Sequence, residues 1–254
     1  MTAAGVALTT IVLVHGLGGD RHVWDDVRQR LARSGVAHDV LTVELPGHGE
    51  NLPGPKAPSI DAAARQVVAR IRQAHAAPAI VVGHSLGGIV AAHVPLVDAG
   101  AVEALVLVDI PIGPTWAGDE IAQMQHALAT DRDRALRDWF GAICQPSQYA
   151  RLLVGLGKLS NDALVGWMHA MKDGAVPDGG RALVVPTLLM ASPLVLPGKK
   201  PRAAELADAG YAHVARLQVE TFAQSKHWIM WDEPDKFVAV LAKFVRAVEG
   251  PSFH

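Results

Sequence analysis

The pentapeptide Gly83-His84-Ser85-Leu86-Gly87 is the stretch of this sequence that decides its fold. It is a G-x-S-x-G motif between an apolar run at residues 79–82, which favours a strand, and small apolar residues at 88–92, which favour a helix. A sharp turn from strand to helix holds the central side chain out at the C-terminal edge of a sheet. Glycines on both sides permit the cramped backbone of such a turn. We therefore expect Ser85 to be exposed, rigidly held and able to attack a carbonyl carbon.

Short apolar runs alternate with helical periodicity on both sides of this motif. Strands are expected at residues 10–14, 39–44, 79–82, 103–109, 187–191 and 215–221. Helices are expected at residues 20–34, 59–75, 86–99, 201–209 and 234–248. Such alternation predicts an α/β fold with a mostly parallel, doubly wound sheet built from right-handed βαβ units. Only about nine residues precede the first strand, so the leading β-hairpin common in such folds is expected to be missing.

The alternation stops after residue 112 and resumes at residue 181. Residues 113–180 have a helical pattern without a strand-like run, and they are too numerous for a loop. We expect a core formed by residues 1–112 and 181–254, with residues 113–180 as a helical cap over the sheet edge. Certain large apolar side chains are candidates to line a substrate pocket, although packing inside the fold is the commoner use of such side chains: Trp116, Trp139, Trp167, Met171 and Trp228.

Composition narrows the classes of partner. The net charge is −2 at pH 7, so we expect no basic surface and no nucleic-acid partner. No apolar run approaches the ~18 uncharged residues of a membrane span, so no membrane partner is expected. The single cysteine, Cys144, leaves no internal disulfide and suits a reducing compartment. With no signal-like pattern at the N-terminus, a cytoplasmic location is expected.

A serine hydroxyl is protonated at neutral pH, so Ser85 needs a base within hydrogen-bonding reach and a third group to orient that base. His227 follows the strand expected at residues 215–221 and precedes the last helix. That position places it on a loop at the same sheet edge as Ser85. His227 is therefore the candidate base; the alternative is a loop histidine that packs beside Trp228.

The anion formed by the attack needs backbone N–H donors. One is expected from Leu86, directly after the nucleophile, and the other from Leu17 in the glycine-rich loop of residues 15–19. The alternative is that these glycines only make a tight strand-to-helix turn. Neither a G-x-G-x-x-G nor a G-x-x-x-x-G-K-[ST] motif is present, and the histidines show no tight ligand spacing. We therefore expect no cofactor and no metal.

The order of these features resembles the α/β-hydrolase superfamily over nearly the whole chain. The resemblance rests on the His15-Gly16-Leu17-Gly18-Gly19 loop, the Gly83-His84-Ser85-Leu86-Gly87 turn, the helical insertion and the late His227. It implies a serine nucleophile, a histidine base and an acid. It also implies that the acids of Asp232-Glu233-Pro234 cap the last helix.

The acid departs from the superfamily's usual pattern. Its common place is just after the strand at residues 187–191, but no acid occurs there before Glu205, which lies in a predicted helix with Asp208. Some members of the superfamily carry the acid one strand earlier, where this chain has Asp109. We expect Asp109 to orient His227; the alternative is a structural aspartate that binds loop amides. Glu44 is a more distant candidate because it ends the wrong strand.

These features favour a serine hydrolase that cleaves a small, largely apolar ester, thioester or lactone through an acyl-enzyme. The alternative on the same fold is a cofactor-independent dioxygenase, a C–C hydrolase or a lyase. In that chemistry the His–Asp pair deprotonates the substrate and the serine is secondary. A third possibility is a non-catalytic ligand-binding protein that keeps the pocket. Each of these would act on a small molecule.

Overall fold

The computed structural model describes residues 9–34 and 39–250. Its centre is a six-stranded sheet in the order β2-β1-β3-β4-β5-β6, in which every neighbouring pair is parallel. The strands are β1 (Ile11–Val14), β2 (Val40–Val43), β3 (Ala79–His84), β4 (Val102–Val108), β5 (Thr187–Ala191) and β6 (Leu217–Thr221). The parallel α/β sheet is thereby confirmed. The predicted lack of a leading β-hairpin concerns the chain before β1, where residues 1–8 lie outside the described part.

The inner strands are continuous apolar runs rather than alternating ones. Every residue of β1, β3 and β5 is buried, which is typical of a parallel sheet covered on both faces. At the two edges of the sheet, β2 and β6 keep partly exposed residues. The strand ends differ from the expected ends by at most two residues, and β5 has the expected bounds.

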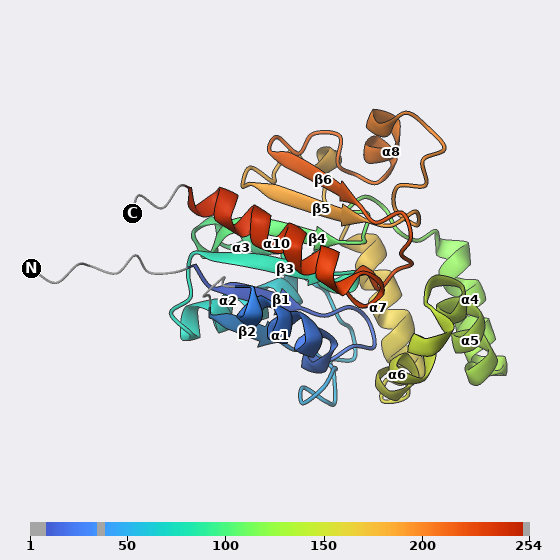
Figure 1. The fold of residues 1–254 in the computed structure, drawn as a ribbon. Coiled ribbons are helices and arrows are strands. Elements are labelled where there is room, and N and C mark those ends of the chain that lie inside the picture. The colour runs from blue at the N-terminus through green and yellow to red at the C-terminus, as the bar shows by residue number, and fades with distance from the viewer. Residues whose placement is uncertain (1–8, 35–38, 251–254) are drawn as a thin grey trace, which may run out of the picture.

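Helices pack against the sheet in pairs. Helix α1 (Asp25–Arg33) contacts α10 (Pro234–Glu249), and α2 (Ile60–Gln73) contacts α3 (Leu86–Val97). In Figure 1, α10 crosses the near face of the sheet. The shorter helices are η1 (Arg21–Trp24), η2 (Ala99–Ala101), α8 (Arg202–Asp208) and α9 (Ile229–Asp232). Within the described ranges, no helix has the length and apolar character needed to cross a membrane.

The segment between β4 and β5 is helical. It contains α4 (Gly118–Thr130), α5 (Arg132–Ile143), α6 (Pro146–Leu156), α7 (Asn161–Asp173) and the short η3 (Asp178–Gly180). Helices α4, α5, α6 and α7 lie together beyond the ends of the strands, on the side to which the arrowheads point in Figure 1. Buried side chains of α7, among them Leu164 and Met168, belong to the same apolar cluster as the sheet. The insertion therefore stands over the edge at which the residues that follow β1, β3 and β4 meet.

Candidate active site

Ser85 forms the turn between β3 and α3. Its backbone has φ 54° and ψ −124°, a region that non-glycine residues rarely adopt and that is found where a site stores strain. The two motif glycines make the turn feasible. A Cβ on Gly83 would lie 2.1 Å from the Gly87 carbonyl oxygen, and one on Gly87 would lie 2.4 Å from the His15 carbonyl oxygen. The Ser85 side chain is thus held at the C-terminal edge of the sheet.

Asp109 follows β4, the neighbouring strand, and is fully buried. Its carboxylate accepts three hydrogen bonds. His227 Nδ1 lies 2.9 Å from Oδ2, the Ser192 N–H lies 2.6 Å from Oδ1, and the Ser192 hydroxyl lies 3.0 Å from Oδ2. Because a carboxylate accepts, His227 Nδ1 carries the proton of this bond and the neutral imidazole has its lone pair on Nε2. That tautomer is the one a general base needs.

Ser85, Asp109 and His227 line one cavity of about 330 Å³. Within the described residues, a hydrogen bond joins His227 to Asp109, whereas none joins His227 to the Ser85 hydroxyl. Bonds between nucleophile and base are often loose in the absence of substrate. The structure therefore brings the three side chains to a common space and links two of them directly.

The backbone N–H groups of Leu17 and Leu86 were expected from the sequence to bind an oxyanion. Leu86 is the first residue of α3, so its N–H has no acceptor inside the helix. Across the described chain, neither the Leu86 N–H nor the Leu17 N–H donates to a protein group. The loop that carries Leu17 is closed by a bond from the Gly19 N–H to the Gly16 carbonyl oxygen, 3.0 Å long. Leu17 itself also lines the cavity. Neither N–H group is therefore occupied by an acceptor in the described part of the chain.

The cavity walls are mostly apolar, and they come both from the insertion and from loops at the sheet edge. Trp116, Trp139 and Trp228 line the cavity, as expected. Trp167 does not: it is 1 % exposed, and its ring centroid lies 5.8 Å from that of His48. Met171, which was also expected to line the cavity and lies one turn further along the same face of α7, does line it. Lining residues that were not expected from the sequence include Ile110, Thr115, Phe140, Ile143, Leu194 and Val195.

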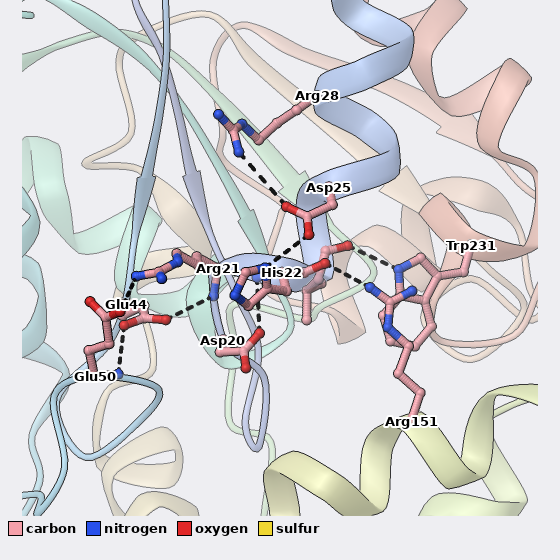
Figure 2. A network of polar contacts seen from close by, with 10 residues as sticks. Asp20, Arg21, His22, Asp25, Arg28, Glu44, Glu50, Arg151 and Trp231 are labelled. Carbon is pink, nitrogen blue, oxygen red and sulfur yellow. Dashed lines mark hydrogen bonds and ion pairs between the residues drawn. The ribbon is translucent and has the colours of Figure 1, made fainter.

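The other acids considered from sequence lie elsewhere. Glu44 accepts from the backbone N–H groups of Arg21, at 3.2 Å, and Glu50, at 2.8 Å, and so fixes the loop after β2 (Figure 2). Glu205 accepts from the Lys199 N–H at 2.7 Å, and Asp208 pairs with Lys200 at 2.7 Å. None of the three lines the cavity. Glu44 and the buried Glu205 bind loop amides, and Asp208 makes a surface ion pair.

The loop that carries His227 has anchors of its own. The His227 N–H donates to the Ile143 carbonyl oxygen at 3.0 Å. Asp232 accepts from the Lys226 N–H at 2.8 Å, and Glu233 accepts from the Ser225 hydroxyl at 2.7 Å. These two acids therefore tie down the loop before α10. Ser192, which binds Asp109, had no signal in the sequence beyond its place directly after β5.

Three other buried histidines surround this region and are neutral. Burial lowers the pKa of His15 to about 4 and that of His48 to about 3, because a charged imidazole loses its hydration there. His84 lies beside the catalytic candidates, and burial lowers its pKa well below 6.5. None of these rings replaces His227 as the histidine bonded to a buried carboxylate.

Comparisons with known proteins agree with this architecture. The sequence model described as "Alpha/beta hydrolase family" matches residues 11–240. A mouse sn-1-specific diacylglycerol lipase, ABHD11, is 26% identical over 94% of this chain and 81% of its own length. A pimeloyl-[acyl-carrier protein] methyl ester esterase of Neisseria meningitidis is 39% identical over 52% of this chain, and the match spans only 43% of that protein.

Solved structures show the same fold. An esterase from Exiguobacterium antarcticum superposes with a TM-score of 0.80 at 21% identity, covering 94% of this chain and 93% of that one. An enol-lactonase from Burkholderia xenovorans LB400 superposes with a TM-score of 0.77 at 19% identity, covering 94% and 91%. At such identities the likeness concerns the fold alone. The match of the family model over residues 11–240, together with this fold, shows that the chain belongs to the alpha/beta hydrolase family.

Proposed function

We propose that the protein hydrolyses carboxylic esters through a covalent acyl–serine intermediate. Ser85 is the nucleophile, His227 the general base and Asp109 the acid that orients the base. The observation that carries the proposal is the 2.9 Å bond between His227 Nδ1 and Asp109 Oδ2 in the cavity that Ser85 also lines. The relatives named as a methyl ester esterase and a diacylglycerol lipase support ester chemistry.

Each step follows from groups at this cavity. The Ser85 oxygen attacks the ester carbonyl carbon, and its proton passes to His227 Nε2. The Leu17 and Leu86 N–H groups bind the oxyanion. The C–O bond to the alcohol breaks as His227 returns the proton to the leaving oxygen. Water then attacks the acyl group with His227 as base, which releases the acid and regenerates Ser85.

The cavity favours neutral substrates of modest size. Among the described residues, its lining carries no charged side chain besides Asp109, and its volume of about 330 Å³ is at the small end for ligand sites. An ester, thioester or lactone with a largely apolar acyl part fits these walls. In this proposal residues 113–180 act as a cap on a core of residues 1–112 and 181–254, and the cap sets the substrate range. The reaction uses no cofactor or metal, and a cytoplasmic location stays a prediction.

The test is turnover of p-nitrophenyl esters with acyl chains of two to eight carbons. The wild-type protein is expected to hydrolyse the short esters, with KM falling as the chain lengthens until the cavity is full. Ser85→Ala is expected to reduce turnover to background. Ester turnover that persists in Ser85→Ala would overturn the proposal.

The position of Asp109 after β4 supports a second candidate reaction, because in cofactor-independent dioxygenases of this fold the acid also follows this strand. In such an enzyme the His227–Asp109 pair would act on the substrate without an acyl–serine. Oxygen consumption or C–C cleavage retained by Ser85→Ala would favour a dioxygenase, a C–C hydrolase or a lyase. A wild-type protein inert to every ester would instead favour a ligand-binding role.

A further inference from the structure

His84 lies between the proposed nucleophile and the proposed base. It is the last residue of β3, directly before Ser85, and its Nε2 is 3.0 Å from the His227 carbonyl oxygen. A carbonyl oxygen only accepts, so Nε2 carries the proton of this bond. The His84 ring also packs on the base loop, which we define as residues 222–228. Its centroid lies 4.7 Å from that of His227 and 5.6 Å from that of Trp228.

The opposite side of the same ring faces the loop that carries Leu17. A Cβ added to Gly16 would come within 2.9 Å of His84 Nδ1 and 3.0 Å of the Ser85 Cβ, so the ring fills the space directly against Gly16. We call residues 15–19 the oxyanion loop and the turn at Ser85 the nucleophile turn. The His84 imidazole therefore contacts both the base loop and the oxyanion loop, and His84 directly precedes the nucleophile turn in the chain.

Burial of the His84 imidazole costs free energy, and the need to fill space does not explain why a histidine is used here. His84 is 1 % exposed, and Nδ1 has no hydrogen-bond partner among the described residues. A buried acceptor without a partner is unfavourable, and a phenyl or isobutyl group would fill the same space without one. What the imidazole supplies, and an apolar ring does not, is the Nε2–H donor to the base loop.

We propose that His84 is a positioning residue that holds the base loop in register with the nucleophile turn and the oxyanion loop. The role in catalysis rests on the proposed function. His227 then has three anchors: its ring on Asp109, its N–H on the Ile143 carbonyl oxygen, and its carbonyl oxygen on His84. Loss of the third lets the loop drift from the Ser85 hydroxyl, and a shift of about 1 Å in a reacting group costs roughly 10²-fold in rate.

The test compares His84→Asn with His84→Gln. The glutamine amide reaches about as far as His Nε2 and restores the donor, whereas the asparagine amide reaches only about as far as Nδ1. His93→Asn is the matched control, because His93 Nε2 makes a bond of the same kind, 2.9 Å long, to the Gly174 carbonyl oxygen away from the cavity. For each variant we would measure kcat and KM on a p-nitrophenyl ester, the Tm, and amide hydrogen exchange of residues 222–228.

In His84→Asn, kcat is expected to fall about 10- to 100-fold with KM changed less than about threefold. The base loop is expected to exchange faster. His84→Gln is expected to recover most of the wild-type kcat and most of the exchange protection of the base loop. His93→Asn is expected to lower the Tm without lowering kcat. The proposal is overturned if His84→Asn keeps normal kcat and exchange, or if His84→Gln is as impaired as His84→Asn. Because exchange needs no substrate, a wild-type protein inert to esters would refute the proposed function and leave the loop measurement decisive for His84.

Discussion

At the scale of single residues, strain coincides with chemistry. Ser85 and Asp109 both have a left-handed backbone, with φ of 54° and 49°, and both stand directly after neighbouring strands. Such conformations cost about 1–3 kcal/mol each and persist where the surrounding structure holds them. Here the Ser85 N–H donates to the Val108 carbonyl oxygen, and the Asp109 N–H donates to that of Met190. The sheet edge itself therefore holds both side chains toward the cavity.

The role of Asp109 makes the first prediction. Asp109→Asn should keep the fold but lower kcat by up to about 10⁴-fold, because the histidine loses both its correct tautomer and the charge that stabilises its cation. Steady-state hydrolysis of a p-nitrophenyl ester measures the effect. Asp208→Asn is the control, since Asp208 pairs with Lys200 at the surface. Near-normal turnover in Asp109→Asn would show that another group orients the base.

Residues with a reactive side chain in a recognisable turn could be placed from sequence, and others could not. The Ser85 motif and the position of Asp109 at a strand end carried enough local information. Ser192 did not, because a hydroxyl after a strand has no signature until its partner is known. Trp167 was placed wrongly because its burial follows from periodicity, whereas its neighbour, His48, comes from a distant loop.

At the scale of elements, α6 contacts the oxyanion loop and α9, the short helix that follows the base loop. A Cβ on Gly155 would lie 1.7 Å from the Gly18 carbonyl oxygen, so α6 touches the oxyanion loop. The Arg151 guanidinium lies 4.2 Å from the ring centroid of Trp231 in α9 and donates to the His22 carbonyl oxygen at 2.7 Å (Figure 2). Helix α6 thus contacts the loop that carries the proposed Leu17 donor, and also α9, the short helix directly after the base loop.

Gly155 and Gly141 give a matched pair for this contact. Gly155→Ala should push α6 from the oxyanion loop and lower kcat by about tenfold or more, since oxyanion donors act only in a narrow geometry. Gly141 lies in α5 with no atom within 4 Å of an added Cβ. Gly141→Ala should therefore raise stability by about 0.5–1 kcal/mol and leave kcat unchanged. Ester kinetics and thermal unfolding of both variants measure these changes in kcat and stability. Equal kcat in the two variants would contradict the contact.

The order of strands and helices was predictable because the spacing of apolar residues that indicates a strand or a helix is a local property of the sequence. The contacts between elements were not. The contact between α6 and Gly18 depends on two glycines, Gly18 and Gly155, that lie far apart in the sequence. Nothing in the sequence around one of them indicates that it packs against the other. The separate short helix α9 likewise followed no periodic signal long enough to be distinguished from a loop.

At the scale of the whole molecule, buried neutral histidines couple stability to pH. The pKa is lowered by burial to about 4 in His15 and to about 3 in His48, and it lies well below 6.5 in His84. In the unfolded chain these groups bind protons below pH 6.5, whereas in the folded chain they do not. The unfolded state therefore binds more protons, and stability falls as the pH drops below 6.5.

We expect the free energy of unfolding to be nearly constant from pH 8 to 7 with respect to these groups. Below pH 6.5, each histidine lowers it by about 1.4 kcal/mol per pH unit, so His15 and His48 together remove about 4 kcal/mol by pH 5. Urea denaturation at pH 7.5, 6 and 5 measures this fall. A free energy of unfolding that is unchanged between pH 7.5 and 5 would show that these rings are hydrated or protonated in the fold.

The overall architecture was the most predictable level, since parallel strands bring all their C-terminal ends to one edge whatever the details of packing. The central claim is that Ser85 is a nucleophile activated there by His227. Labelling of the native protein with an alkyl fluorophosphonate, followed by peptide mapping by mass spectrometry, tests it most directly. We expect one phosphonyl adduct, on Ser85, that is lost on prior denaturation and formed far more slowly in His227→Ala. A folded protein that gains no adduct, or gains it on another residue, would contradict it.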